Sequence, residues 1–189
     1  MADARLGIQY GLDDVHPAKL RRAAKKRPAL DLRFYEVEGA RKQYYWQIFR
    51  KYHYLSHDFN KSSKLILCEC NGTLCGFAAS LPIPQGFHPN LWKAHRIVVL
   101  PDHQGVGIGN ALTTFVAEEF TRRKKDYTIT TSNPSMIMAL KKNPRWACTF
   151  FGRKKYKKAL SRMQAHFDKS QSNNRVTAKF MFKKRTLTP

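Results

Sequence analysis

The residues best suited to chemistry lie in a glycine-rich turn, Gln104-Gly105-Val106-Gly107-Ile108-Gly109. Glycine allows the backbone to take positive φ angles and to approach a ligand closely, because it has no Cβ. The apolar residues that follow recur at helical spacing, so the turn leads into the start of a helix. Unpaired N–H groups and the helix dipole favour an anion at that position. The sequence therefore predicts a phosphate-binding loop over residues 104–110.

Two common phosphate-binding loops do not fit this pattern. No Gly-Lys-Ser/Thr sequence closes the turn, which disfavours a nucleoside-triphosphate P-loop. The dinucleotide-binding pattern places G-x-G-x-x-G directly after a strand, whereas here G-x-G-x-G is separated from the preceding strand by Pro101 and the residues after it. A glycine turn that only joins two elements is the remaining alternative.

The elements around the turn are a strand and a helix. Ile97–Leu100 is a short apolar run rich in β-branched residues, which is typical of a buried strand, and Pro101 ends it. The helix after the turn carries an apolar face and a polar face. We expect Leu112, Phe115, Val116 and Phe120 on the apolar face and Thr113, Thr114, Glu118 and Glu119 on the polar face.

The rest of the chain predicts an α/β fold with a mixed, largely antiparallel twisted sheet flanked by helices. Asn71-Gly72 is typical of a two-residue hairpin turn. Strands are expected at residues 31–38, 64–69, 73–81, 127–132, 146–152 and 176–183, and helices at 16–27, 40–54 and 133–142. The apolar face of the helix at 40–54 is expected to consist of Tyr45, Ile48, Phe49 and Tyr52.

The pattern V-x-P-x-x-Q-G-x-G-I-G, starting at Val99, resembles motif A of the GCN5-related N-acetyltransferases (GNAT). The resemblance implies the GNAT acyltransferase fold and acetyl-CoA, or another acyl-CoA, as cosubstrate. It also implies that the strands Ile97–Leu100 and Thr128–Ser132 splay apart around the acyl arm. The residues implied in binding acyl-CoA are Ile97, Val98 and Val99 through their backbone, Gln104, Gly105, Val106, Gly107, Ile108, Gly109 and Asn110 around the pyrophosphate, and Asn133 along the pantetheine chain.

The catalytic acid and base are less clearly marked, because the helix at residues 135–142 lacks the tyrosine that the family commonly uses as acid. The candidates are His53, Tyr54, His95, Tyr127 and Ser132, and a structural role is the alternative for each. A histidine can titrate near neutral pH and serve as base, which favours His53. The sequences Tyr52–Ser56 and Thr131–Pro134 also resemble a GNAT subgroup of phages and mobile elements that includes the Mom-type DNA-modification proteins. This resemblance implies catalytic roles for His53, Tyr54 and Ser132.

The net charge of +22 is concentrated near the C-terminus. Residues 141–189 contain fifteen Lys or Arg and one acid, Asp168. Residues 31–140 contain thirteen Lys or Arg and nine Asp or Glu. Such a block indicates a polyanionic partner, since each neutralised phosphate releases counterions. A solubilising face or a disordered tail is the alternative, and an anionic membrane surface is a further option, although no amphipathic apolar face accompanies the charges. We expect a basic N-terminal extension (1–30), a GNAT-like core (31–152) and a basic C-terminal segment (153–189). Nucleic acid, DNA rather than RNA, would bind the two flanks.

The sequence also allows predictions of the cellular location and of the state of the cysteines. No apolar run approaches the ~20 residues that a membrane span requires, and the N-terminus lacks the apolar centre of a signal peptide. We therefore expect a cytoplasmic protein of a bacterium or a phage-infected cell, with no membrane partner. The hairpin would place Cys68 opposite Cys75. The cysteine spacing matches no standard zinc pattern, so we expect buried, reduced thiols and no metal.

These observations lead to three hypotheses for the function. The first is an acyl-CoA-dependent N-acyltransferase that modifies a nucleic acid, with a DNA base favoured. The second is a GNAT acetyltransferase that acts on charged tRNA or a protein lysine. The third is a non-catalytic nucleic-acid-binding protein on a GNAT fold, which would not bind coenzyme A.

Overall fold

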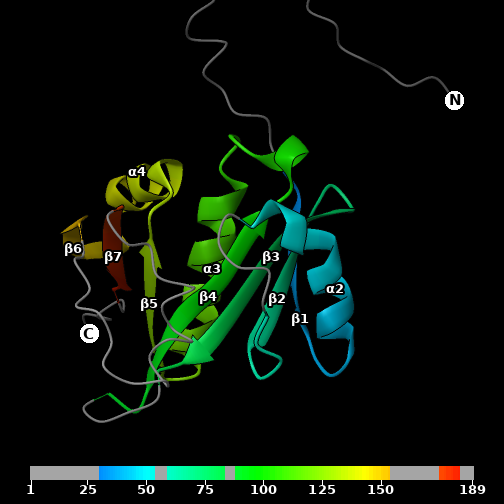
Figure 1. Cartoon of the computed structure of the whole chain (residues 1–189), viewed down its shortest axis with the longest axis horizontal. Coiled ribbons are helices and arrows are strands. Elements are labelled where there is room, and N and C mark those ends of the chain that lie inside the picture. The colour runs from blue at the N-terminus through cyan, green and yellow to red at the C-terminus, as the bar shows by residue number, and fades with distance from the viewer. Residues whose placement is uncertain (1–29, 54–58, 84–87, 154–174, 184–189) are drawn as a thin grey trace, which may run out of the picture. The chain divides into compact units, whose positions relative to one another are not determined.

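The computed structural model describes residues 30–53, 59–83, 88–153 and 175–183. The chain divides into two compact units, Met1–Leu30 and Asp31–Pro189, and the described helices and strands belong to the second (Figure 1). The basic helix expected at residues 16–27 lies outside the described residues, as does Tyr54.

Seven strands form one sheet in the order β1-β2-β3-β4-β5-β7-β6. Among the described strands, β4 and β5 are the one parallel pair, and all other neighbours are antiparallel. This arrangement confirms the predicted mixed, largely antiparallel sheet. The strands are β1 (Leu32–Val37), β2 (Lys64–Cys70), β3 (Thr73–Pro82), β4 (Leu91–Val99), β5 (Asp126–Thr131), β6 (Trp146–Arg153) and β7 (Val176–Phe182).

Helices cover both faces of the sheet. The helical elements are α2 (Arg41–Phe49), the 3-10 turn η1 (Arg50–Tyr52), the 3-10 turn η2 (Pro101–His103), α3 (Ile108–Arg122) and α4 (Pro134–Lys142). Phe77 of β3 packs against Phe49 of α2, with ring centroids 5.3 Å apart. The preceding residue, Gly76, faces α3: a Cβ placed on it would lie 3.1 Å from Leu112. Since successive residues of a strand point to opposite faces, α2 and α3 lie on opposite sides of β3.

Two predicted helix faces are corrected by the structure. Tyr52, expected on the apolar face, is 40% exposed. Trp46 of α2 is buried instead, with 1% of its surface exposed. The chain tightens into a 3-10 turn after Phe49, which rotates Tyr52 out of the helical stripe. Thr113 of α3, expected on the polar face, is fully buried. Its hydroxyl donates to the carbonyl oxygen of Gly109 at 2.6 Å, so the buried polar group is satisfied within the helix.

The β2–β3 hairpin is confirmed, but its register differs from the expected one. Asn71 and Gly72 both have positive φ angles, as a two-residue turn requires. A β-bulge then inserts Cys75 as an extra residue, so that Cys68 pairs with Gly76. The sulfur atoms of Cys68 and Cys75 still lie 3.6 Å apart. Burial raises the pKa of both thiols above the ordinary value.

The predicted burial of the cysteines holds for three of the four. Cys68, Cys70 and Cys75 are buried and free, whereas Cys148 is free and exposed on β6. Because β6 is the last strand of the described sheet, a residue on it lacks a neighbouring strand on one side. The expectation of a buried thiol at Cys148 is therefore wrong.

Candidate active site

The gap between β4 and β5 is the feature around which the candidate site is built. The two strands pair at Leu91, Trp92 and Lys93, and the register extends no further. Beyond this point β4 continues to pair with β3 up to Val99, while β5 pairs with β7 up to Thr131. The edge of β4 that faces β5 is therefore unpaired with that strand along Ile97–Val99. The predicted splay of the two strands is confirmed.

A β-bulge in β4 explains where the strands part. Arg96 pairs with Ala79 and Ala94 pairs with Ser80, so His95 is the extra residue. A bulge bends its strand and increases the local twist. The bulge lies just beyond Lys93, where the pairing with β5 stops. The backbone thus directs β4 away from β5 and presents His95 at the start of the gap.

The glycine-rich loop lies at the end of β4, as Figure 1 shows for the connection from β4 to α3. After η2, the side chain of Gln104 donates from Nε2 to the carbonyl oxygen of Val99 at 2.8 Å, which closes the loop against the strand. Gly105 and Gly107 have φ angles of 82° and 102°. Residues with a Cβ rarely adopt such angles, so the loop requires glycine at these two positions.

The first turn of α3 leaves backbone donors without protein partners. Its N-cap, Gly107, provides no side-chain cap, and the N–H of Ala111 is the first to bond back, to the carbonyl oxygen of Gly107. The N–H groups of Ile108, Gly109 and Asn110 therefore have no partner among the described residues. A Cβ placed on Gly105 would meet nothing within 4 Å, so the loop has open space beside it. These features fit a diphosphate group bound at the helix N-terminus.

His95 has a buried ring nitrogen that is not hydrogen-bonded. Its Nε2 has no partner within the described part of the chain. Its Nδ1 lies 3.5 Å from Nη1 of Arg96, and the same guanidinium nitrogen donates to the carbonyl oxygen of His95 at 2.9 Å. Burial, followed by the positive charges of Arg96 and Lys93 and by His53, lowers the pKa of His95 to about 3. The imidazole is therefore neutral at physiological pH.

His53 lies close to His95 in an aromatic environment. It directly follows η1 and is 7% exposed, with its ring 6.0 Å from that of Trp46. Phe59 stacks on Trp46 at 5.6 Å and lies 6.5 Å from the ring of His95. His53 is also one of the groups that lower the pKa of His95. Two histidines thus share one largely apolar environment, and Tyr54 falls outside the described residues.

Ser132 and Asn133 follow the end of β5, on the other side of the gap. The backbone N–H of Asn133 donates to Oγ1 of Thr131 at 3.1 Å. The side chain of Asn133 accepts from the N–H of Met136 at 3.1 Å and so caps α4. These bonds fix the turn that carries Ser132, which is half-buried. Asn133 therefore has a structural role in capping a helix, whatever else it contacts.

Tyr127 does not fit the role of a catalytic acid. Its side chain is 1% exposed and lies in the paired part of β4 and β5. Its hydroxyl forms a 2.8 Å hydrogen bond with that of Ser80. Burial raises the pKa of the phenol above its ordinary value. Since the hydroxyl is enclosed and already satisfied, Tyr127 is a core residue.

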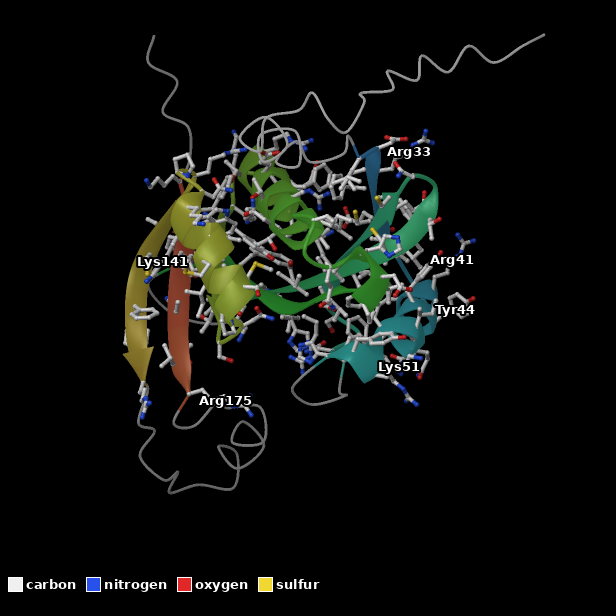
Figure 2. All side chains as sticks on the ribbon, turned by 90° about the horizontal axis from the view of Figure 1, so that it is seen from above. Arg33, Arg41, Tyr44, Lys51, Lys141 and Arg175 are labelled. Atoms are coloured by element: carbon white, nitrogen blue, oxygen red, sulfur yellow. The ribbon has the colours of Figure 1, made fainter. Side chains whose placement is uncertain are left out.

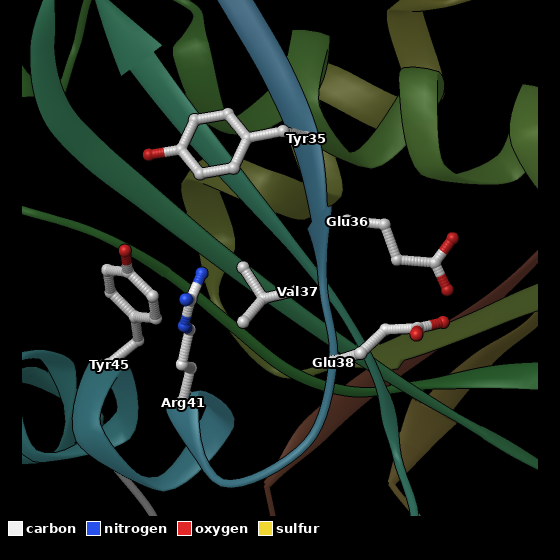
Figure 3. A pocket seen from close by; sticks show the side chains of 6 residues that line it. All are labelled: Tyr35, Glu36, Val37, Glu38, Arg41 and Tyr45. Atoms are coloured by element: carbon white, nitrogen blue, oxygen red, sulfur yellow. The ribbon is translucent and has the colours of Figure 1, made fainter.

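A separate hollow of about 420 Å³ lies between β1 and α2. Figure 3 shows its six lining side chains, which are Tyr35, Glu36, Val37, Glu38, Arg41 and Tyr45. Tyr35 donates to Glu69 at 2.8 Å, and Glu36 pairs with Lys64 and Arg123. None of the predicted site residues lines this hollow, so it is distinct from the glycine loop and the strand gap.

Metal sites and membrane-spanning helices are both absent from the described residues. No group of three or more His, Cys, Asp or Glu side chains in this part of the chain is placed to hold a metal ion. Nor does any described helix combine the length and the apolar character needed to cross a bilayer.

Comparison with known proteins gives a family match for this chain. The sequence model of the acetyltransferase (GNAT) family matches residues 30–140, more than half of the chain. The chain belongs to the GNAT acetyltransferase family. As a GNAT protein it is a transferase that uses acyl-CoA as cosubstrate. No curated protein matches the chain in sequence.

Solved structures of GNAT proteins share the fold at low sequence identity. An acetyltransferase from Bacillus subtilis in complex with CoA has a TM-score of 0.58 and 13% identity, over 82% of this chain and 99% of that chain. The yncA protein from Salmonella typhimurium, a putative acetyltransferase solved with acetyl-CoA, has a TM-score of 0.55 and 14% sequence identity. The match covers 86% of this chain and 98% of that chain. The ribosomal-protein-S18-alanine N-acetyltransferase from Escherichia coli has a TM-score of 0.53 and 15% sequence identity. The match covers 83% of this chain and 99% of that chain.

One residue of the candidate site, Arg96, is missing from the sequence-based prediction. It is 7% exposed although it carries a charge, and it contacts His95 through both the backbone carbonyl and the ring. The available signal was the polar pair His95-Arg96 inside a run that is otherwise typical of a buried strand. Polar residues in such a strand require partners, and this requirement could have marked the pair.

Proposed function

We infer that this GNAT protein transfers an acyl group from acyl-CoA to an amine of a nucleic acid, with a DNA base as the favoured acceptor. The observation that carries the nucleic-acid part is the charge: 35 Lys and Arg against 13 Asp and Glu, a net charge of +22. A cationic protein attracts a polyanion strongly and disfavours small cationic amines as substrates. The resemblance of Tyr52–Ser56 and Thr131–Pro134 to Mom-type proteins supports the same choice.

The proposed cosubstrate site consists of the glycine loop and the gap between β4 and β5. The N–H groups of Ile108, Gly109 and Asn110 would bind the diphosphate, together with the loop residues from Gln104 to Gly107. Ile97, Val98 and Val99 would hold the acyl arm through their backbone, and Asn133 would lie along the pantetheine chain. Acyl-CoA supplies a thioester, which is activated toward nucleophilic attack.

The reaction forms one bond and breaks another. The acceptor nitrogen bonds to the acyl carbon, the carbon–sulfur bond breaks, and one proton passes overall from the nitrogen to the sulfur of coenzyme A. The nitrogen must be neutral when it attacks, and the carbonyl oxygen must be polarised. We propose His53, Tyr54 and Ser132 as the groups that handle the protons, with His53 as the base.

His95 takes a different role in this proposal. A group whose pKa is about 3 is a weak base at neutral pH. A neutral imidazole whose Nδ1 faces Nη1 of Arg96 would carry its proton on Nε2, the nitrogen without a partner in the described chain. We propose that this N–H donates a hydrogen bond within the reacting site and positions the acceptor or the thioester carbonyl.

A second acceptor class has a specific observation in its favour. One structural neighbour is named as an N-acetyltransferase of an alanine of ribosomal protein S18, so the fold accommodates a protein acceptor. A protein lysine, or the amino group of charged tRNA, is therefore the alternative acceptor. Charged tRNA would also satisfy the charge argument, because it is a polyanion.

Nucleoside analysis tests the proposed acceptor directly. DNA and RNA from cells that make the protein would be digested to nucleosides and compared by mass spectrometry with those from cells that make His53→Ala. We expect an acylated nucleoside in cells that make the wild-type protein and none in cells that make His53→Ala. Unchanged nucleosides together with acylated lysines or acylated aminoacyl-tRNA would contradict the DNA-base acceptor and favour the alternative.

A further inference from the structure

Exposed aromatic side chains gather on the segment that leads to His53. Tyr44 of α2 is 67% exposed and Tyr52 of η1 is 40% exposed. Both rings are therefore accessible to a ligand from one short helical segment. Tyr44 contacts Tyr45 edge-on at 5.4 Å, which restricts its orientation. The ring of Tyr52 is contacted by Nζ of Lys51 at 4.8 Å.

The same segment is purely cationic. Residues 41–52 contain four Lys or Arg and no acid. Arg41, Arg50 and Lys51 are exposed and form no ion pair with any residue that the structure describes. Lys42 is occupied, because its Nζ donates to the carbonyl oxygens of Lys61 and Ser63. Arg50 and Lys51 are therefore available to an external anion, and Arg41 is exposed at the rim of the hollow that Glu36 and Glu38 also line.

Three residues of this segment point outward from one side of the fold. Figure 2 shows Arg41, Tyr44 and Lys51 projecting from the outer side of α2 and the turn after it. Arg41 and Tyr44 are three residues apart and share a helix face. We define the α2–η1 face as the exposed cations and tyrosines of this segment, which are Arg41, Tyr44, Arg50, Lys51 and Tyr52. It runs along the helix and ends next to His53, the proposed catalytic base.

We propose that the α2–η1 face binds a single-stranded stretch of nucleic acid and delivers it to the active site. The proposal rests on the proposed function, whose acceptor it specifies as an unpaired strand. Cations would contact the phosphates, and Tyr44 and Tyr52 would stack on exposed bases. Aromatic platforms interleaved with Lys and Arg are the usual means of holding single strands, because every base has a face on which to stack. In a duplex, those base faces are already covered by neighbouring bases.

The structure argues against a membrane as the occupant of this face. A helix that lies on a bilayer inserts an apolar face between the lipids. The buried residues of α2 are Trp46 and Phe49, at 1% and 0% exposed, and both belong to the protein core. The exposed residues of α2 and η1 are Gln47, the cations Arg41, Arg50 and Lys51, and the tyrosines Tyr44 and Tyr52, whose tips are polar. This composition matches a phosphate backbone with unpaired bases.

The chain offers a matched control on another helix. Lys141 and Lys142 of α4 are also exposed, and Nζ of Lys141 lies 3.9 Å from the ring centroid of the exposed Phe151. Figure 2 shows Lys141 on the opposite side of the structure from α2. Reversing these two charges changes the net charge as much as reversing Arg50 and Lys51. The comparison therefore separates a local surface from the overall charge.

Fluorescence anisotropy with a labelled thymidine 20-mer tests the proposal, with a duplex of the same length for comparison. For Tyr44→Ala/Tyr52→Ala we expect at least about tenfold weaker binding of the single strand, since each stacked base contributes ~1–3 kcal/mol. Tyr44→Phe/Tyr52→Phe should restore binding, because the ring is retained. For Arg50→Glu/Lys51→Glu, the slope of log K against log salt should fall by about 1.4, as two lost phosphate contacts predict. Lys141→Glu/Lys142→Glu should change neither measurement by as much.

The outcomes distinguish this proposal from the function on which it rests. Suppose that the wild-type protein binds and acylates nucleic acid but the α2–η1 variants behave like the α4 control. This result would overturn the binding role of the α2–η1 face and leave the proposed function intact. If the wild-type protein binds neither strand nor duplex, both are overturned. A preference for the duplex by the wild-type protein would also overturn the single-strand assignment. Circular dichroism of each variant would confirm that the fold is retained.

Discussion

The side chain of Gln104 donates to the carbonyl oxygen of Val99 at 2.8 Å and thereby ties the glycine loop to the end of the central strand. The bond spans five residues and holds together two parts of the proposed acyl-CoA site. One part is the backbone of β4, which would face the acyl arm. The other is the loop that would contact the diphosphate. Backbone hydrogen bonds within η2 hold the same connection, from the N–H groups of His103 and Gln104 to the carbonyl oxygens of Leu100 and Pro101.

Removing the side-chain amide of Gln104 should weaken acetyl-CoA binding without unfolding the protein. We expect Gln104→Ala to raise the KM for acetyl-CoA about 2- to 10-fold, because a hydrogen bond of this kind contributes ~0.5–1.5 kcal/mol. Steady-state kinetics with a free-thiol assay would measure the change. Gln47→Ala, at an exposed position of α2, is the control and should leave KM unchanged. An equal KM for Gln104→Ala and the wild type would contradict the tether.

His95 should make the stability of the protein sensitive to acid. The pKa of its imidazole falls from 6.5 in the unfolded chain to about 3 in the folded protein, so below pH 6.5 the unfolded state binds a proton that the folded state does not. Above pH 6.5 the buried neutral imidazole does not lower the free energy of unfolding. As the pH falls from 6.5 toward 3, protonation of His95 in the unfolded chain lowers the free energy of unfolding progressively. Between about pH 7.5 and 4.5, the melting temperature of the wild type should therefore fall more than that of His95→Gln.

The titration of His95 can also be observed directly by NMR. We expect its imidazole resonances to stay at the neutral position throughout this pH range, because the pKa of His95 lies near 3. A His95 resonance that titrates near pH 6.5 would show that the ring is not shielded in this way. His95→Gln should lower kcat, and an unchanged kcat would remove His95 from the reacting site.

Tyr127 should be dispensable for catalysis. Tyr127→Phe removes the hydroxyl that bonds to Ser80 at 2.8 Å and leaves the Ser80 hydroxyl buried without that partner. We expect the free energy of unfolding to fall by ~1–3 kcal/mol and kcat to stay within about twofold of the wild type. Urea denaturation and steady-state kinetics measure the two quantities. A loss of kcat greater than about tenfold in a folded variant would restore Tyr127 as a candidate acid.

Cysteine alkylation should distinguish the exposed thiol from the buried ones. Cys148 is exposed, while Cys68, Cys70 and Cys75 are buried, and burial raises the pKa of the Cys68 and Cys75 thiols. Treatment of the native protein with N-ethylmaleimide should add one adduct by intact mass, and Cys148→Ser should add none. Four rapid adducts on the native protein would contradict the described core. After unfolding in guanidinium, the wild type should add four.

The elements around the site follow from local patterns, and this is why they could be predicted. The turn at Asn71-Gly72, the proline that ends β4 and the glycines at 105 and 107 each impose a backbone conformation that few other residues allow. Asn133 and Pro134 mark the start of α4 in the same way. These positions define the strand–loop–helix unit and the order of the sheet.

The features that were not predicted depend on contacts between distant residues. The bulges at Cys75 and His95 arise from pairing with a neighbouring strand, which no local pattern specifies. The burial of Trp46 in place of Tyr52 depends on a helix that tightens after Phe49. Arg96 is buried and pairs with Ala79 of β3, directly after the bulge at His95. A charged residue at such a position cannot be recognised from sequence periodicity alone.

The central claim is that the glycine loop binds the diphosphate of acyl-CoA, and calorimetric titration with acetyl-CoA tests it most directly. Gly105→Ala and Gly39→Ala form a matched pair, because both glycines have positive φ and open space around the missing Cβ. Each substitution should cost ~1–2 kcal/mol of backbone strain. We predict that the wild type and Gly39→Ala bind acetyl-CoA with equal affinity and that Gly105→Ala binds at least tenfold more weakly. Equal affinity of all three proteins, or no binding by the wild type, would contradict the claim.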